Sequence, residues 1–83
     1  MDHYLLTARS VTHAQQMAQA LARWGVGATM RRADRALAKN GCGYTLQVGE
    51  NKLTRAYEAL RSSGVLPLRV FRVSGGETRE VLP

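Results

Sequence analysis

Cys42 is the residue whose chemistry sets it apart, because it is the only cysteine in this chain of 83 residues. It lies between Gly41 and Gly43. Glycine neighbours leave a sulfur unshielded and allow backbone conformations closed to other residues. A thiol becomes a nucleophile when it is ionised, and nearby cations lower its pKa. The spacing therefore predicts a thiol that another molecule can approach closely.

Basic residues gather in the segment before this cysteine. They are Arg31, Arg32, Arg35 and Lys39, and their charge would favour the thiolate. Such a thiolate could attack a sulfur or selenium donor and carry a persulfide, or it could serve as a redox sensor. The alternative is that Cys42 is a small buried hydrophobe at the start of a strand, as free cysteines commonly are.

The two histidines offer a base for this thiol. His13 is the candidate, because cysteine–histidine pairs activate sulfur nucleophiles; its alternative role is in the cap of a helix. His3 is expected at the partly exposed end of a strand. Two histidines and one cysteine show none of the spacings of a zinc site, and no glycine-rich phosphate motif occurs. We therefore expect neither a metal nor a cofactor.

The hydrophobic pattern predicts the elements that position these residues. Strands are expected over 3–8, 27–32, 44–48 and 68–73, the third with Tyr44, Leu46 and Val48 inward. Ser10 or Thr12 caps a first helix, for which residues 12–15 have the T-x-x-Q form of a capping box, and Gly25 ends it. A second helix follows residues 49–51 and ends at 62–64. The helices are expected to bury two apolar stripes, Ala14, Met17, Ala18, Leu21 and Ala22 in the first, and Leu53, Ala56, Tyr57 and Leu60 in the second.

The order β-α-β-β-α-β predicts an α+β fold of the ferredoxin-like type. In that two-layer sandwich, right-handed crossovers place both helices on one face of a four-stranded antiparallel sheet. We expect one domain over residues 1–83, with an ordered core of about 3–73 and a frayed tail over 74–83. A chain this short buries only ~60% of its unfolded surface, so a homodimer would add stability.

Composition narrows the setting and the partners. A single cysteine forms no internal disulfide, and no signal peptide or ~18-residue apolar span occurs, so we expect a cytoplasmic protein without membrane contact. The net charge of +6 favours an anionic partner; ordinary solubility charge is the alternative.

RNA-recognition domains share the predicted order of elements, and aromatics on their third strand stack bases. Here Cys42 and Gln47 replace two of those aromatics, and the remaining Tyr44 is expected to face inward. The sequence therefore disfavours nucleic acid as a partner.

Three segments together carry a family resemblance. Residues 4–8 read Y-L-L-T-A and residues 10–14 read S-V-T-H-A; the family has Y-L-L-T-F and S-T-T/H-A. Residues 21–26 read L-A-R-W-G-V and correspond to the end of the family's helix, which is near A-G-I-P. The chain thus resembles the small bacterial domains described as selenium/sulfur (Se/S) carrier-like proteins, over residues 3–73. The family's P-R-x-I/L-S-S-S-C-G segment corresponds to residues 34–43, where Asp34 replaces the proline, Ala38, Lys39 and Asn40 replace the serines, and one residue is added.

The resemblance implies a carrier that takes sulfur or selenium from a donor protein on Cys42 and passes it to an acceptor protein. Arg35 and its basic neighbours would stabilise the charged sulfur, and partner enzymes would supply the acid–base steps. We therefore expect an accessory carrier more than a stand-alone enzyme. The alternative is a non-catalytic interaction or regulatory domain that uses its sheet face or an edge strand.

Overall fold

A computed structural model describes residues 2–33 and 43–81 of the chain. Its elements follow in the order β1 (His3–Thr7), α1 (Val11–Arg23), β2 (Thr29–Arg32), β3 (Tyr44–Gly49), α2 (Leu53–Ser62), β4 (Val70–Ser74) and β5 (Glu77–Val81). A short 3-10 helix, η1 (Glu50–Lys52), leads into α2. The predicted α+β class is thereby confirmed.

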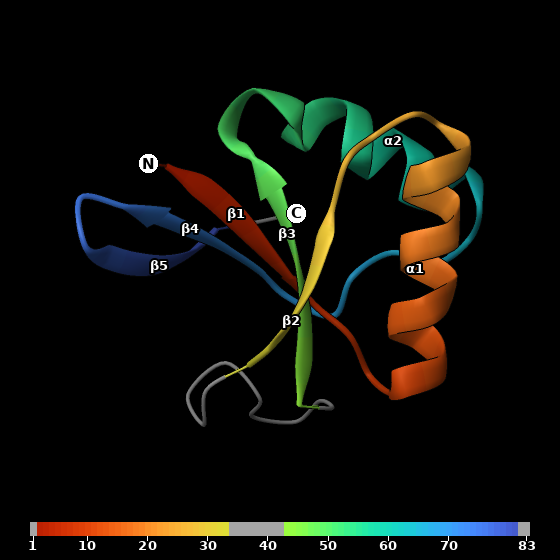
Figure 1. The fold of residues 1–83 in the computed structure, drawn as a ribbon, viewed down its shortest axis with the longest axis horizontal. Coiled ribbons are helices and arrows are strands. Elements are labelled where there is room, and N and C mark those ends of the chain that lie inside the picture. Colours follow the sequence, from red (N-terminus) through yellow and green to blue (C-terminus); the bar gives the residue numbers. More distant parts are fainter. Residues whose placement is uncertain (1, 34–42, 82–83) are drawn as a thin grey trace.

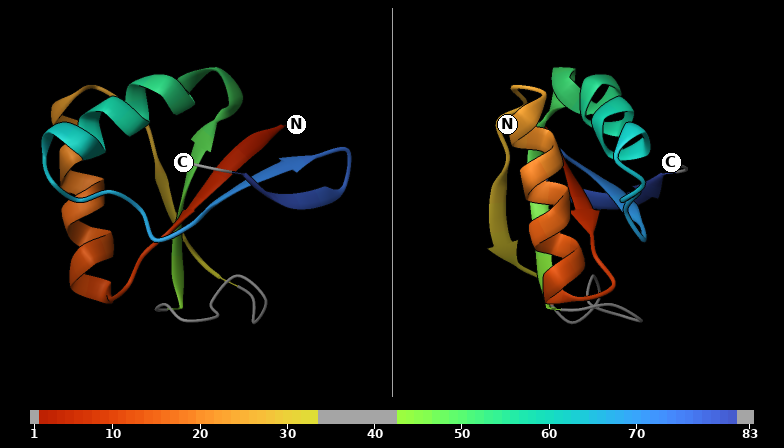
Figure 2. Two further views of the ribbon diagram at one scale, coloured as in Figure 1. Left: turned by 180° about the vertical axis from the view of Figure 1, so that it is seen from behind. Right: turned by 90° about the vertical axis from the view of Figure 1, so that its right-hand side faces the viewer.

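The sheet has five strands in the order β2-β3-β1-β4-β5, and every neighbouring pair is antiparallel. Both helices lie on one side of it, and the hairpin of β4 and β5 extends beyond them (Figures 1 and 2). The predicted four-stranded sheet is therefore wrong in its number of strands. Residues 74–81 do not form part of the expected frayed tail, since β5 pairs with β4 along its whole length.

Two glycines form the turn that allows the fifth strand to pair with the fourth. Gly75 and Gly76 have φ values of 57° and 82°, a left-handed conformation that suits a two-residue hairpin turn between twisted strands. Ser74 pairs with Glu77 across the turn, and Val70 pairs with Val81 at the other end of the hairpin. Because the segment is rich in charged residues, its sequence did not predict a strand, and the strand forms by pairing with β4.

Helix α1 begins two residues earlier than the capping-box prediction requires. Ser10 is the N-cap, and its hydroxyl accepts a hydrogen bond of 3.0 Å from the backbone N–H of His13. Ser10 was one of the two expected caps, but Thr12 lies inside the helix and the T-x-x-Q box is wrong. The predicted stop is confirmed, because Gly25 has a φ of 70° directly after the C-cap Trp24.

The core lies between the helices and the face of the sheet that they cover. Its largest fully buried apolar side chains come from both layers: Leu6, Met17, Leu21, Leu46, Val48, Leu60 and Val70. Tyr44 packs against this cluster, so the predicted inward face of β3 is confirmed. Ala22 is exposed while Ala20 is buried, so the buried stripe of α1 lies slightly to one side of the predicted one.

Strand boundaries differ where the chain crosses between layers. β2 starts at Thr29, two residues later than predicted, and β4 starts at Val70. Before β4, the Leu68 N–H donates to the Thr7 carbonyl at 2.9 Å, and Arg69 and Thr7 exchange further bonds. Within residues 2–33 and 43–81, no helix is long and apolar enough to cross a membrane.

Candidate functional site

The described residues include the stem of the predicted thiol site but not its centre. Cys42, Gly41, Arg35 and Lys39 lie outside the described residues. Gly43, Arg31, Arg32 and His13 lie within them. The geometry of the site is therefore given by β2, by β3 and by the first turn of α1.

A short antiparallel ladder holds the two ends of the segment that contains Cys42. The Ala33 N–H donates to the Gly43 carbonyl at 2.8 Å, and the register continues with Arg32 opposite Tyr44. Gly43, the residue after Cys42, is exposed, and a Cβ added to it would meet no atom of the described residues within 4 Å, its chain neighbours aside.

Arg31 and Arg32 lie on this ladder but point to opposite faces of the sheet. Arg31 donates from Nη1 to the Gln47 Oε1 at 2.8 Å, on the face without helices. The Arg32 Cζ lies 6.0 Å from the centroid of the Tyr44 ring, on the face that carries the core. Neighbouring side chains on a strand alternate in this way. The two side chains therefore leave the strand toward opposite faces, although both residues border the hollow lined by His3 and Leu5.

His13 is held by backbone groups on both sides of its ring. Its Nδ1 accepts a hydrogen bond of 2.9 Å from the Arg9 N–H, and its Nε2 lies 3.0 Å from the Leu66 carbonyl. Because Nδ1 is the acceptor, the neutral ring carries its proton on Nε2, which donates to that carbonyl. Only 8% of the residue is exposed. These bonds tie the start of α1 to the chain after α2, a task that the sequence did not reveal.

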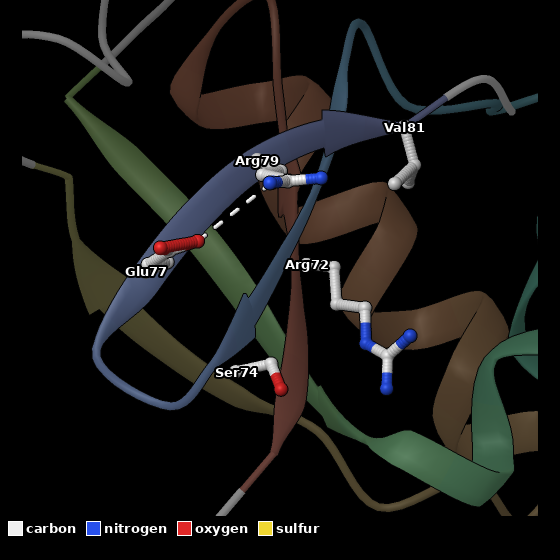
Figure 3. A pocket seen from close by; sticks show the side chains of 5 residues that line it. All are labelled: Arg72, Ser74, Glu77, Arg79 and Val81. Atoms are coloured by element: carbon white, nitrogen blue, oxygen red, sulfur yellow. Dashed lines mark ion pairs between the residues drawn. The ribbon is translucent and has the colours of Figure 1, made fainter.

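Charges of opposite sign are distributed unevenly between the two edges of the sheet. Each of the five carboxylates among the described residues lies within 4.0 Å of an arginine, in the pairs Asp2–Arg72, Glu50–Arg72, Glu58–Arg61, Glu77–Arg79 and Glu80–Arg69. A hollow of about 350 Å³ on the β4–β5 hairpin contains charges that are balanced in this way (Figure 3). None of these carboxylates pairs with Arg31 or Arg32, so the positive charge of β2 is not neutralised by them.

One ion pair lies over the face of the sheet that has no helices. Arg69 donates to both carboxylate oxygens of Glu80, at 3.2 Å and 2.7 Å, and its Cζ lies 4.9 Å from the Phe71 ring centroid. The hydrogen bond from Arg69 lowers the pKa of Glu80, and the bond to Glu80 raises the pKa of Arg69. This pair helps to cover Phe71, which is buried although no helix lies on its face.

The same face has a second hollow of about 310 Å³. Leu5 and Val73 give it an apolar lining, and His3, Arg31 and Gln47 add polar groups. Among the described residues, no group of three potential ligands from His, Cys, Asp and Glu could hold a metal ion.

Comparisons with protein-family models, with curated proteins and with solved structures found no match for this chain. What the structure itself defines is a small α+β domain with five antiparallel strands, two helices on one face and a basic edge strand at β2. Function is accordingly argued from the residues and from this geometry.

Proposed function

We propose that this protein is a sulfur or selenium carrier with Cys42 as its acceptor thiol. The observation that carries the proposal is the position of the only cysteine, one residue before the backbone of Gly43, which is bonded to Ala33. The neighbouring strand supplies Arg31 and Arg32, whose charge no described carboxylate neutralises. Positive charge favours a thiolate, and the resemblance to Se/S carrier-like proteins supports this use of the thiol.

The transfer is a thiol–disulfide type of exchange. The Cys42 thiolate attacks the outer sulfur of a persulfide on the donor protein, a new S–S bond forms, and the donor's S–S bond breaks. The donor leaves as a thiolate, and Cys42 carries the persulfide, so no external oxidant or reductant is consumed. An acceptor protein then removes the outer sulfur by the same step. We do not assign His13 to this chemistry, because both of its ring nitrogens bond backbone groups.

The proposal extends to the fold type and the setting. Strands β2-β3-β1-β4 have the spatial order of a ferredoxin-like sheet, which β5 extends at one edge, and we class the domain accordingly. A lone thiol that shuttles sulfur suits a reducing cytoplasmic compartment, where cysteines stay unpaired.

Mass spectrometry after incubation with a cysteine desulfurase and free cysteine tests the carrier function. We expect a gain of one sulfur atom on Cys42, lost again on treatment with a thiol reductant. The Cys42→Ser variant is the matched control and should gain nothing. If the intact protein gains no sulfur, or if the serine variant gains as much, the carrier function is refuted.

A non-catalytic interaction domain is the second candidate. It is favoured by the face of the sheet that no helix covers and by the edge strand β2, of which all four residues are exposed. Under this alternative Cys42 is a packing residue, and alkylating reagents should label the folded protein slowly. Fast labelling, with an apparent thiol pKa well below the usual ~8.5, favours the carrier.

A further inference from the structure

The outer edge of β2 presents backbone groups to which no described strand is paired. β2 is the terminal strand of the sheet, and the Ala33–Gly43 bond sets the alternation of its ladder with β3. In an antiparallel pair, every second residue turns its N–H and C=O toward the partner strand. Thr29 and Arg31 therefore face β3, while the N–H and C=O groups of Met30 and Arg32 point away from the sheet.

The side chains of this edge are apolar at one position and positive at two. Met30 is 39% exposed, one of the two large apolar side chains that are exposed among the described residues. It shares the helix-bearing face of the sheet with Arg32, whereas Arg31 lies on the opposite face. A strand added here would meet a cation on each face and an apolar contact beside Arg32.

The charges of Arg31 and Arg32 determine which kind of strand can pair with this edge. Charged side chains on an edge strand disfavour pairing between copies of one protein, because a second β2 would bring arginine against arginine. An acidic strand meets attraction at the same positions, so the edge repels its own copy and accepts the opposite charge. The hairpin at the other edge differs, since Glu77 and Glu80 bond Arg79 and Arg69 there.

We propose that the β2 edge binds an extended acidic segment of a partner protein by strand addition. An antiparallel segment would place two adjacent acidic residues opposite Arg32 and Arg31 and an apolar residue opposite Met30. Main-chain bonds to Met30 and Arg32 supply affinity, and the side chains supply selectivity. This docking goes beyond the carrier function and needs no thiol, so its success or failure is independent of sulfur transfer.

The test is an NMR titration of the uniformly labelled full chain with a capped eight-residue peptide. The peptide carries two adjacent glutamates followed by valine at its centre, with threonines around them. We expect saturable shifts at the amides of residues 29–32, in the Cys42→Ser variant as in the natural chain. A peptide with glutamines in place of the glutamates should bind about twofold to thirtyfold more weakly, the range expected for two exposed ion pairs.

Met30→Pro isolates the backbone contribution. Proline removes the outward N–H of Met30, whereas the bonds of its neighbours to β3 remain, and we expect at least a tenfold loss of affinity. The matched control is Thr78→Pro in β5, which removes an outward N–H at the opposite edge and should leave binding unchanged.

A charge reversal keeps the proposal testable even if Met30→Pro fails to fold. Arg31→Glu combined with Arg32→Glu should lose the acidic peptide and gain the same peptide with lysines in place of the glutamates. The proposal is overturned if binding of the acidic peptide does not saturate, or if the shifts it causes fall on β5 or on the face without helices. It is also overturned if folded Met30→Pro binds the peptide as tightly as the natural chain does, or if the charge-reversed variant does not bind the lysine peptide in place of the acidic one.

Discussion

Replacing His13 by alanine tests whether this ring ties the two layers together. The change removes the acceptor for the Arg9 N–H and the donor to the Leu66 carbonyl, two bonds of 2.9 Å and 3.0 Å. A typical hydrogen bond contributes about 0.5–1.5 kcal/mol to the free energy of unfolding, so the pair is worth about 1–3 kcal/mol. In a domain of this size each kcal/mol shifts Tm by roughly 4–8 °C. We therefore expect His13→Ala to lower Tm by about 8–16 °C for a central value near 2 kcal/mol.

Two partial replacements separate the bonds. An asparagine amide can accept near the position of Nδ1, and a glutamine amide can donate near the position of Nε2. His13→Asn and His13→Gln should therefore each lower the free energy of unfolding by about half as much as His13→Ala does. Urea and thermal unfolding measure the stability, and amide exchange at Arg9 should accelerate in His13→Ala but less in His13→Asn. Gln15→Ala, at an exposed position of the same helix, is the control and should stay within about 0.5 kcal/mol. An alanine variant as stable as this control would refute the role of His13 as a tie.

Two further predictions concern the β4–β5 hairpin. The bond from Arg69 lowers the pKa of Glu80 from its ordinary value of 4.5, so the pair stabilises the fold above that pH and its contribution is lost as the pH falls through the lowered pKa. Glu80→Gln should therefore be less stable than the natural chain at pH 7, and urea unfolding at pH 3 should show a smaller difference in stability. A difference that grows toward acid pH would contradict this role of the ion pair. Gly76 has a φ of 82°, so Gly76→Ala should cost about 1–2 kcal/mol and accelerate amide exchange in β5 more than in β1; unchanged exchange across residues 77–81 would show that the turn does not depend on glycine.

Local sequence features determined the order of the six elements from β1 to β4, the short 3-10 helix aside, and the residues that end the helices. Gly25 and Gly64 both have a φ of 70°, and each follows a helix at the predicted place, because a helix end is decided by a few neighbouring residues. The alternation in residues 44–48 likewise gave the inward face of β3, since side-chain direction on a strand follows from position alone. Leu46 and Val48 are accordingly 1% exposed.

Other features were decided by contacts between distant parts of the chain. The segment of β5 is charged and exposed, and it becomes a strand only because β4 offers it a ladder. The ion pair between Arg69 and Glu80 depends on the same hairpin, which brings the two side chains together across the sheet.

Cys42 and its basic neighbours marked a candidate site from residue types alone, but spacing could not say how those neighbours are arranged. The register of β2 on β3 places Arg31 and Arg32 on opposite faces, which a list of nearby cations does not reveal. His13 was a candidate base, and the fold instead gives its ring two backbone partners, one of them 53 residues away. Sequence alone thus determined which groups could react and where the helices end, whereas tertiary structure decided which groups face one another, because pairing across a sheet and between layers depends on residues distant in the chain.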